Sequence, residues 1–552
     1  MKKQFLWIVL IIILCLPAVW ALFQPGFFSS HDGEWMVIRL TDFHRSLRDG
    51  QFPVRFAGRL NHGYGYPVFN FLYPFSFYLT EFFHLLGFSF VNSIKVVFIL
   101  SFLLSGIFMF LWTKNHWGKL GGLISALVYV YTPYRFLDVY VRGSLGEAVA
   151  FIFPPIIFLS IDRLRKKRHK IDLIIGALAL AALITSHNTM AMFFTGLTVA
   201  YIFFLKEKKS IIYYLPRRVK AGLLSTIFFG LLLSCFFWLP ALLEKKHVIF
   251  GQVLISNFFV HFPTLRQLLV PSWGYGPSLP LSDQDTLSFQ IGTFNLLVFI
   301  LVSVLMLIKS KFRKKKEIKF FFLIFLVSFF LMTKHSYFFW RVLLVYNFIQ
   351  FPWRLLSLTT FSTAFLAGAL IKFWPQKFKK ITAFFFIVFL LILNRSYIKP
   401  EYHVVKDESF YTTNEATTTV ANEYMPVWVK DHPQKRAENK IEILKGKGKI
   451  EDLVVKSNKI SFLVRLEEES LIQINTIYYP GWQVFVDNQD WDFDFENKYG
   501  LIQFSLPKDS HEIVVIFKET VLRKTANIIS LISLVFLFGV AVKEYVQKKK
   551  KK

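Results

Sequence analysis

The sequence predicts an α-helical membrane protein of about twelve spans with a small outer β domain near its C-terminus. The chain has 552 residues, of which 54% are hydrophobic, 18% aromatic and only 18% charged, and its mean hydropathy is +0.44. Soluble domains carry about 25% charge. Apolar stretches alternate with short basic runs over most of the chain, whereas residues 395–522 are polar and show β-type patterns. These three observations exclude a purely soluble enzyme.

The distribution of charge predicts topology. The net charge is +29, yet residues 395–522 hold 16 basic and 21 acidic residues, so the remainder holds 49 basic and 15 acidic ones. Short basic loops between apolar spans are typical of the cytoplasmic side of membrane proteins. The basic excess therefore indicates a lipid bilayer, and not a nucleic acid, as the partner. The main basic runs are 163–170, 206–220, 309–319, 372–380 and 543–552.

The first span is predicted from Phe5 to Leu22, and the lysines before it place the N-terminus in the cytoplasm. The Lys-rich C-terminus is predicted on the same side, so the number of crossings is even. A further apolar stretch from Pro67 to Phe90 is predicted to lie in or re-enter the outer leaflet without crossing. The other eleven candidates fall near 95–112, 118–134, 146–162, 171–187, 190–205, 220–240, 289–308, 318–333, 355–373, 381–394 and 523–542.

This topology divides the chain into three regions. Residues 1–394 form a transmembrane domain with a first outer loop at 24–66, residues 395–522 form the outer β domain, and residues 523–552 form a final span with a cytoplasmic tail. The segments 134–146 and 241–288 also lie outside. No predicted span carries a run of ionisable residues at its centre, so the chemistry is expected at the outer face.

The outer β domain is predicted as a small sandwich without disulfides, because both cysteines lie in apolar stretches elsewhere. Short alternating runs are separated by turn residues such as Pro480-Gly481 and Asp487-Asn488. Its aromatic residues Tyr478, Tyr479, Trp482 and Trp491 either stack on sugar rings or belong to the core of a structural lid; alternation favours the structural role. The predicted strands are 459–465, 471–477, 483–486, 501–504 and 512–517.

The first outer loop opens with two acids, Asp32 and Glu34, directly after the first span. They precede an amphipathic helix predicted to lie on the membrane surface, with Met36, Leu40, Phe43 and Leu47 on one face. Two acids at the exit of a span can take a proton from a hydroxyl or ligate a divalent metal. In the alternative interpretation, Asp32 caps this helix and Glu34 complements its dipole.

Five further positions are candidate ligand contacts. Arg55 and Arg354 either clamp a lipid phosphate or snorkel to headgroups. Arg142 and Glu147 flank Gly143 and Gly146, so that they either face a common cavity or form an ion pair that ties the loop. His187 stands at an outer span end, where a lone histidine is more often a satisfied interface residue.

These segments resemble the GT-C superfamily of membrane glycosyltransferases. The resemblance rests on the acidic first loop, the Gly63-Tyr-Gly-Tyr-Pro67 turn, the Arg142-Gly-Ser-Leu-Gly-Glu147 segment, the Phe351-Pro-Trp-Arg354 segment and Tyr478-Tyr-Pro-Gly-Trp482. More narrowly, the chain resembles the bacterial membrane families labelled "6-pyruvoyl-tetrahydropterin synthase-related" and YfhO-like. The soluble synthase in that label needs a His-rich zinc site, for which the sequence has no signature.

The resemblance implies a GT-C-like fold in a bacterial plasma membrane and transfer of a sugar from a polyprenyl-phosphate donor to an extracytoplasmic glycan acceptor. It assigns Asp32 as catalytic base or metal ligand, with Glu34 as a second acid and Mg²⁺ or Mn²⁺ as the candidate metal. Arg142, Arg354 and Arg55 would stabilise the departing phosphate, beside Glu147, and His44 and His187 would position sugar hydroxyls. Two alternatives remain: a lipid or polysaccharide flippase, and a non-catalytic scaffold for the β domain.

Overall fold

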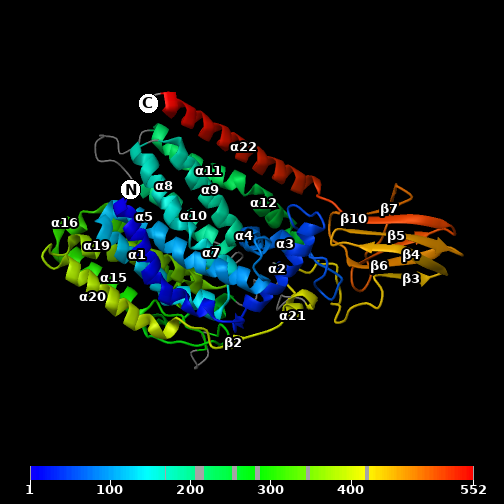
Figure 1. Cartoon of the computed structure of the whole chain (residues 1–552), viewed down its shortest axis with the longest axis horizontal. Coiled ribbons are helices and arrows are strands. Elements are labelled where there is room, and N and C mark those ends of the chain that lie inside the picture. The colour runs from blue at the N-terminus through cyan, green and yellow to red at the C-terminus, as the bar shows by residue number, and fades with distance from the viewer. Residues whose placement is uncertain are drawn as a thin grey trace.

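The computed structural model describes residues 2–167, 169–204, 217–250, 258–279, 286–342, 349–416 and 422–550. Most of these residues form a helical part, and two antiparallel sheets project from one of its ends (Figure 1). The N- and C-termini and α16 (Ser310–Arg313) lie at the opposite end. Parts of the predicted basic runs 163–170, 206–220 and 543–552 and of the outer segment 241–288 lie outside the described residues.

The helices follow the predicted apolar stretches, because a chain in hydrocarbon has to satisfy its backbone hydrogen bonds internally. The longer ones are α1 (Lys2–Val19), α2 (Gly33–Arg48), α4 (Pro74–Leu85), α5 (Phe90–Tyr131), α8 (Phe153–Lys167), α9 (Lys170–Ser186), α10 (Asn188–Phe204), α11 (Arg217–Leu233), α15 (Thr293–Ile308), α17 (Lys316–Leu331), α19 (Leu356–Phe373), α20 (Lys379–Asn394) and α22 (Val521–Lys550). The shorter ones are α3 (Val68–Phe71), α6 (Pro133–Phe136), α7 (Leu145–Ala150), α12 (Cys235–Leu243), α14 (Leu265–Leu269), α18 (Tyr337–Val342) and α21 (Glu408–Thr413).

Helix α5 contains two antiparallel arms. The backbone leaves the helical region at Gly118, where φ is 79°, and a Cβ placed on Gly106 would lie only 3.0 Å from Val130. Gly106 and Val130 are 24 residues apart and would lie about 36 Å apart along one straight helix, so the chain has to fold back between them. The two arms correspond to the predicted spans 95–112 and 118–134.

Each of the twelve predicted spans overlaps a helix or an arm of one. In the described residues, six helices are long and apolar enough to cross a bilayer, or up to eight if each of two bent helix pairs is one span. The chain is therefore a multi-pass membrane protein, and the count of twelve stays a prediction. Between Pro67 and Phe90 the longest helix, α4, has only 12 residues, which is about 18 Å and too short to cross.

The helix predicted after the first span forms as α2, but it is more deeply buried than an amphipathic surface helix, and its place relative to the membrane surface stays a prediction. Ten of its residues are buried, including Asp42 and Ser46 on the face expected to be polar. It packs against α4, α5 and α21, so that protein covers both faces. A helix between two parts of one protein loses the exposed polar face that a surface helix has.

The outer β domain is a sandwich of two antiparallel sheets, as predicted. All five predicted strands are present, and β3 (Ile441–Lys445), β4 (Gly448–Val455) and β8 (Gln489–Trp491) add to them. One sheet has the order β4-β5-β10-β7-β8 and the other β3-β6-β9. The five predicted strands are β5 (Lys459–Leu466), β6 (Ser470–Ile477), β7 (Trp482–Val486), β9 (Leu501–Leu506) and β10 (Ser510–Phe517).

Two of the four aromatic residues that could either stack on sugar rings or belong to the core lie in the interior of the sandwich. Tyr479 is fully buried and Trp482 is 3% exposed, where it packs edge-on against Phe56 of the first outer loop. These two side chains are therefore core residues and do not present a face to sugar rings. Another short sheet pairs β1 (Phe27–Phe28), just after the first helix, with β2 (His403–Val404).

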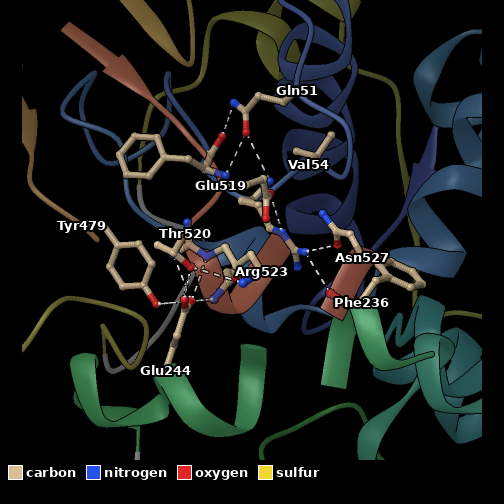
Figure 2. A network of polar contacts seen from close by, with 12 residues as sticks. Gln51, Val54, Phe236, Glu244, Tyr479, Glu519, Thr520, Arg523 and Asn527 are labelled. Carbon is tan, nitrogen blue, oxygen red and sulfur yellow. Dashed lines mark hydrogen bonds and ion pairs between the residues drawn. The ribbon is translucent and has the colours of Figure 1, made fainter. Parts of the chain in front are cut away.

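A buried polar network joins the sandwich to the helices, as Figure 2 shows. Glu244, just after α12, accepts hydrogen bonds from Arg523 of α22 at 2.9 and 3.0 Å, from Tyr479 at 3.2 Å and from Asn70 at 2.6 Å. Arg523 is fully buried and Glu244 is 4% exposed. The network fixes the start of the last helix against the outer β domain.

Candidate active site

The candidate active site is built on the segment from Pro133 to Ala150, between α5 and α8. It contains α6, a π-helical turn from Leu137 to Val141, a tight turn and α7, and all its residues are buried. π-helical turns are rare and occur frequently at functional sites. This segment brings the side chains of Asp138, Arg142 and Glu147 into contact with one another.

Arg142 and Glu147 form an ion pair at the centre of this segment. The Nη1 atom of Arg142 lies 2.7 Å from Glu147 and 2.7 Å from Asp138. Tyr134 donates a hydrogen bond to the other oxygen of Glu147, and Trp353 lies under the guanidinium at 5.0 Å. Burial and the neighbouring Glu147 raise the pKa of Asp138 well above its usual range, although Arg142 opposes the shift. Arg142 and Glu147 therefore form the ion pair that ties the loop, and the common cavity stays a prediction.

His187 and Arg354 reach the same carboxylate from other elements. The Nε2 atom of His187 lies 3.6 Å from Glu147, and the Nε atom of Arg354 lies 3.9 Å from it. His187 Nδ1 accepts the Met190 N–H at 3.2 Å, so this imidazole is neutral with its proton on Nε2. Arg354 also donates to Thr189 at 3.2 Å, while its own Nε has no hydrogen-bond partner and its side chain is 19% exposed.

Asp32 is held at the edge of this cluster by its backbone. Its N–H donates to the carbonyl oxygen of Arg142 at 2.9 Å, and the N–H of His31 donates to Val141 at 2.9 Å. Gly143, with a φ of 64°, permits this approach, because a Cβ there would lie 2.6 Å from the Gly33 nitrogen. Asp32 is the N-cap residue of α2 and Glu34 lies in the first turn, but the side chain of Asp32 makes no cap hydrogen bond, contrary to the cap interpretation. Within the described residues its carboxylate makes no hydrogen bond or ion pair.

Tyr73 connects Asp32 with the arginines. Burial raises the pKa of Tyr73 to about 12, with Arg354 and Arg142 opposing the shift and Asp32 adding to it. Its ring lies 5.2 Å from that of His187 and against Gly146, where a Cβ would be 2.1 Å from the ring. Tyr73 therefore feels the charges of Asp32 and of both arginines.

Three other predicted site residues are engaged elsewhere. Glu34 pairs with Lys406 at 2.7 Å, which ties α2 to the segment before α21. His44 pairs with Glu81 of α4 at 2.7 Å. Arg55 is 2% exposed and donates to Glu519, Asn527 and the carbonyl of Phe236 at 2.9–3.1 Å, at the start of the last helix (Figure 2). The structure does not bring these three side chains into the cluster around Glu147.

The side chains near Asp32 do not fit a protein-built metal site. In the residues that the structure describes, no group of three or more His, Cys, Asp or Glu side chains is arranged to hold a metal ion. Glu34, the second candidate ligand, is neutralised by Lys406. One carboxylate supplies too few oxygen ligands for a divalent cation, and no step of the reaction is routed through a metal.

Sequence reasoning did not assign a site role to Tyr73, Tyr134, Asp138 or Thr189. Asp138 had a local signal, since an acid four residues before an arginine forms a pair on one face of a helical turn. Tyr73 and Thr189 had none, because they reach the cluster through the packing of α4 and α10 against α7.

Comparisons with known proteins give distant similarities. No family model matches the chain. An uncharacterized protein of Lactococcus lactis subsp. cremoris (strain MG1363) is 23% identical over 261 residues, which are 46% of this chain and 42% of that protein. The chain therefore matches less than half of that relative, and the resemblance to the two narrower families stays a prediction.

Two solved structures share part of the arrangement of elements. One is arabinofuranosyltransferase AftD from Mycobacteria, at a TM-score of 0.49 and 13% identity over 73% of this chain and 28% of AftD. The other is the oligosaccharyltransferase AglB from Archaeoglobus fulgidus, at a TM-score of 0.43 and 12% identity over 77% of this chain and 61% of AglB. Their names state that both enzymes transfer sugars.

Proposed function

We propose that this protein is a membrane glycosyltransferase. It would take a sugar from a polyprenyl-phosphate donor in the bilayer and transfer it to a glycan acceptor outside the cytoplasm. The observation that carries the proposal is the unpaired carboxylate of Asp32, held by its backbone beside a cluster that contains the buried Arg142 and the partly exposed Arg354. A base for the acceptor hydroxyl and positive charge for the departing phosphate are the two groups that this reaction needs.

In this mechanism Asp32 takes the proton of the acceptor hydroxyl. The hydroxyl oxygen then bonds to the anomeric carbon, and the bond from that carbon to the phosphate oxygen breaks with its electron pair on the phosphate. A single displacement of this kind inverts the anomeric centre, which NMR of the product tests. No general acid is required, since the phosphate is already a good leaving group.

The arginines have different roles. Arg142 is engaged by Glu147 and Asp138, both at 2.7 Å, and its carbonyl oxygen accepts the Asp32 N–H, so that Arg142 acts as a positioning residue that orients Glu147 and the Asp32 loop. Arg354 retains a donor without a partner and is partly exposed. Arg354 is therefore the side chain that we assign to the phosphate.

The orientation is part of the proposal. The sandwich and the two termini lie at opposite ends of the helical part (Figure 1), as expected if the termini are cytoplasmic and the β domain is outside the plasma membrane. The short basic segment around α16 lies at the terminal end, which agrees with the cytoplasmic location of basic loops.

The test is glycosyl transfer in membranes that contain the wild type or Asp32→Asn, with labelled polyprenyl-phosphate sugars as donors. Loss of a general base lowers the rate by about 10²–10⁴-fold. Glu34→Gln is the matched control, because it removes an acid two residues away whose partner is Lys406. Equal activity of Asp32→Asn and the wild type, with both proteins inserted, would refute the role of Asp32. If neither protein consumes any donor in a panel of sugars, the result would favour a flippase or a scaffold.

A further inference from the structure

A pocket lies between α2 and the outer β domain, away from the cluster around Glu147. It is small and partly open to solvent. Helix α2 contributes one wall, and the loop before β5 and the strands β6 and β7 contribute the other. The residues that matter for its chemistry are Arg45, Gly58, Lys440, Lys456, Thr476 and Trp482.

The cations of this pocket have unused donors. Lys440 donates to the carbonyl oxygens of Gly63 and Asn475, both at 2.7 Å, which leaves the third hydrogen of its ammonium group free. Arg45 and Lys456 are exposed, and in the described part of the chain their side chains make no hydrogen bond or ion pair. Gly58 allows the first outer loop to approach the loop before β5 closely, because a Cβ on Gly58 would lie 2.6 Å from Ser457.

Two buried polar atoms of the same pocket lack partners. They are the hydroxyl oxygen of Thr476 and the indole nitrogen of Trp482, on side chains that are 2% and 3% exposed. Thr476 lies where the pairing of β6 with β9 is interrupted between Ile474 and Ile477. A buried donor without an acceptor is costly, and native structures generally provide a partner. Both groups can donate, as can all three cations, so an acceptor-only ligand suits the set.

The electrostatic surroundings of Lys440 also favour an anion in the pocket. Burial lowers the pKa of Lys440 to about 7, the cations Arg436 and Arg45 add to the effect, and Glu415 opposes it. The other nearby acids are already engaged: Asp49 accepts the Ser457 N–H at 2.7 Å, and Asp42 lies 3.7 Å from Arg59. An anion in the pocket would restore the charged form of Lys440.

We propose that this pocket binds an oxyanion, namely a phosphate, sulfate or carboxylate group, through Arg45, Lys440, Lys456, Thr476 and Trp482. The planar fork of Arg45 matches such groups, and Trp482 and Thr476 supply directed donors at the base of the site. The site does not depend on the proposed glycosyl transfer, since it shares no residue with that cluster. A free anion and an anionic lipid headgroup offer the same chemistry.

The experiment is isothermal titration calorimetry of the full chain in phosphatidylcholine nanodiscs with sodium sulfate, whose charge is constant between pH 6 and 9. We expect Arg45→Gln to weaken binding about tenfold, the equivalent of one lost charge-assisted hydrogen bond. Arg48→Gln is the matched control: it lies one turn further along α2, is exposed and does not line the pocket. Equal weakening by the two variants, or no heat of binding to the wild type at pH 6, would overturn the proposal.

The pH dependence gives a second readout. Above pH 7 the anion has to draw a proton onto Lys440, so sulfate affinity should fall by up to about tenfold per pH unit until the pKa of the bound state is reached. Lys440→Met should remove that slope, and an unchanged slope would contradict the assignment. If nanodiscs with phosphatidylglycerol weaken sulfate binding to the wild type but not to Arg45→Gln, the lipid headgroup fills the site. If they have no effect, the ligand is an anion from solution.

Discussion

The backbone N–H of Asp32 donates to the carbonyl oxygen of Arg142 at 2.9 Å, across 110 residues of sequence. This contact joins the first outer loop to the turn before α7, and it leaves the carboxylate of Asp32 without a protein partner in the described residues. A carboxylate held by its backbone keeps its position when substrate replaces water around it. Pre-organisation of this kind lowers the entropic cost of bringing a base to a hydroxyl.

Gly143→Ala should abolish transfer activity. The residue has a φ of 64°, and a new Cβ would lie 2.6 Å from the Gly33 nitrogen, so the segment before α2 would have to move away from Arg142. The control is Gly50→Ala, where φ is 96° but no atom lies within 4 Å of the new Cβ. Both variants incur backbone strain of about 1–3 kcal/mol, which thermal unfolding measures, but only Gly143→Ala should lose activity. Equal activity of the two variants would show that the contact is dispensable.

Arg354→Gln and Arg142→Gln should differ in stability. Arg354 has one hydrogen bond, to Thr189, and is partly exposed, so its loss should change the unfolding midpoint little while lowering kcat/KM by about 10²-fold. Arg142 is 6% exposed and is the nearest cation to the buried Glu147, so its loss removes most of the compensation for that charge and costs about 3–5 kcal/mol. Unfolding scans in detergent, together with initial rates, check both expectations. A large loss of stability in Arg354→Gln would make Arg354 structural.

The pair of Glu244 and Arg523 should behave as one unit. Either Glu244→Gln or Arg523→Met alone leaves a buried charge at the base of the β domain and should cost about 3–5 kcal/mol. The double variant should cost much less than the sum of the single ones, because no charge then remains unpaired. A double-mutant cycle on the unfolding free energy measures this coupling. Additive losses would mean that the two side chains are independently satisfied.

Asp42 should make the protein less stable as the pH rises from about 4 to about 6. Burial raises the pKa of Asp42 to about 6, although Arg59 and Arg45 oppose the shift, whereas an unfolded chain has a value near 3.9. The folded state therefore binds the proton more tightly, and its advantage, about 3 kcal/mol, is lost through that window and stays lost above it. Asp42→Asn should remove this component. Stability curves of wild type and variant that remain parallel from pH 4 to pH 7 would contradict the assignment.

The sequence by itself predicted most of the secondary structure. Hydropathy located the helices, including the break near Gly118 that separates two arms of α5, and alternation located five strands of the sandwich. The turn at Asp487 and Asn488 follows from local chemistry, since both have the positive φ that these residue types tolerate. Such features depend on neighbours in sequence, and their signals are therefore local.

Of the predicted site residues, the structure joins four, Arg142, Glu147, His187 and Arg354, with Asp32 held beside them. The Arg142-Gly-Ser-Leu-Gly-Glu147 segment carried its own signal in the spacing of its charges and glycines. The roles of Asp32 and Arg354 were indicated by resemblance, because one acid or one arginine beside a span has many equivalent explanations.

Tertiary packing alone decided which charges remain free. Glu34 and Arg55 carry the same charges as Asp32 and Arg354, yet Lys406 neutralises Glu34 and Glu519 neutralises Arg55. Those partners lie 372 and 464 residues away in sequence. A charge is available for chemistry only if no opposite charge is packed against it, and that depends on contacts between distant segments that no local pattern encodes.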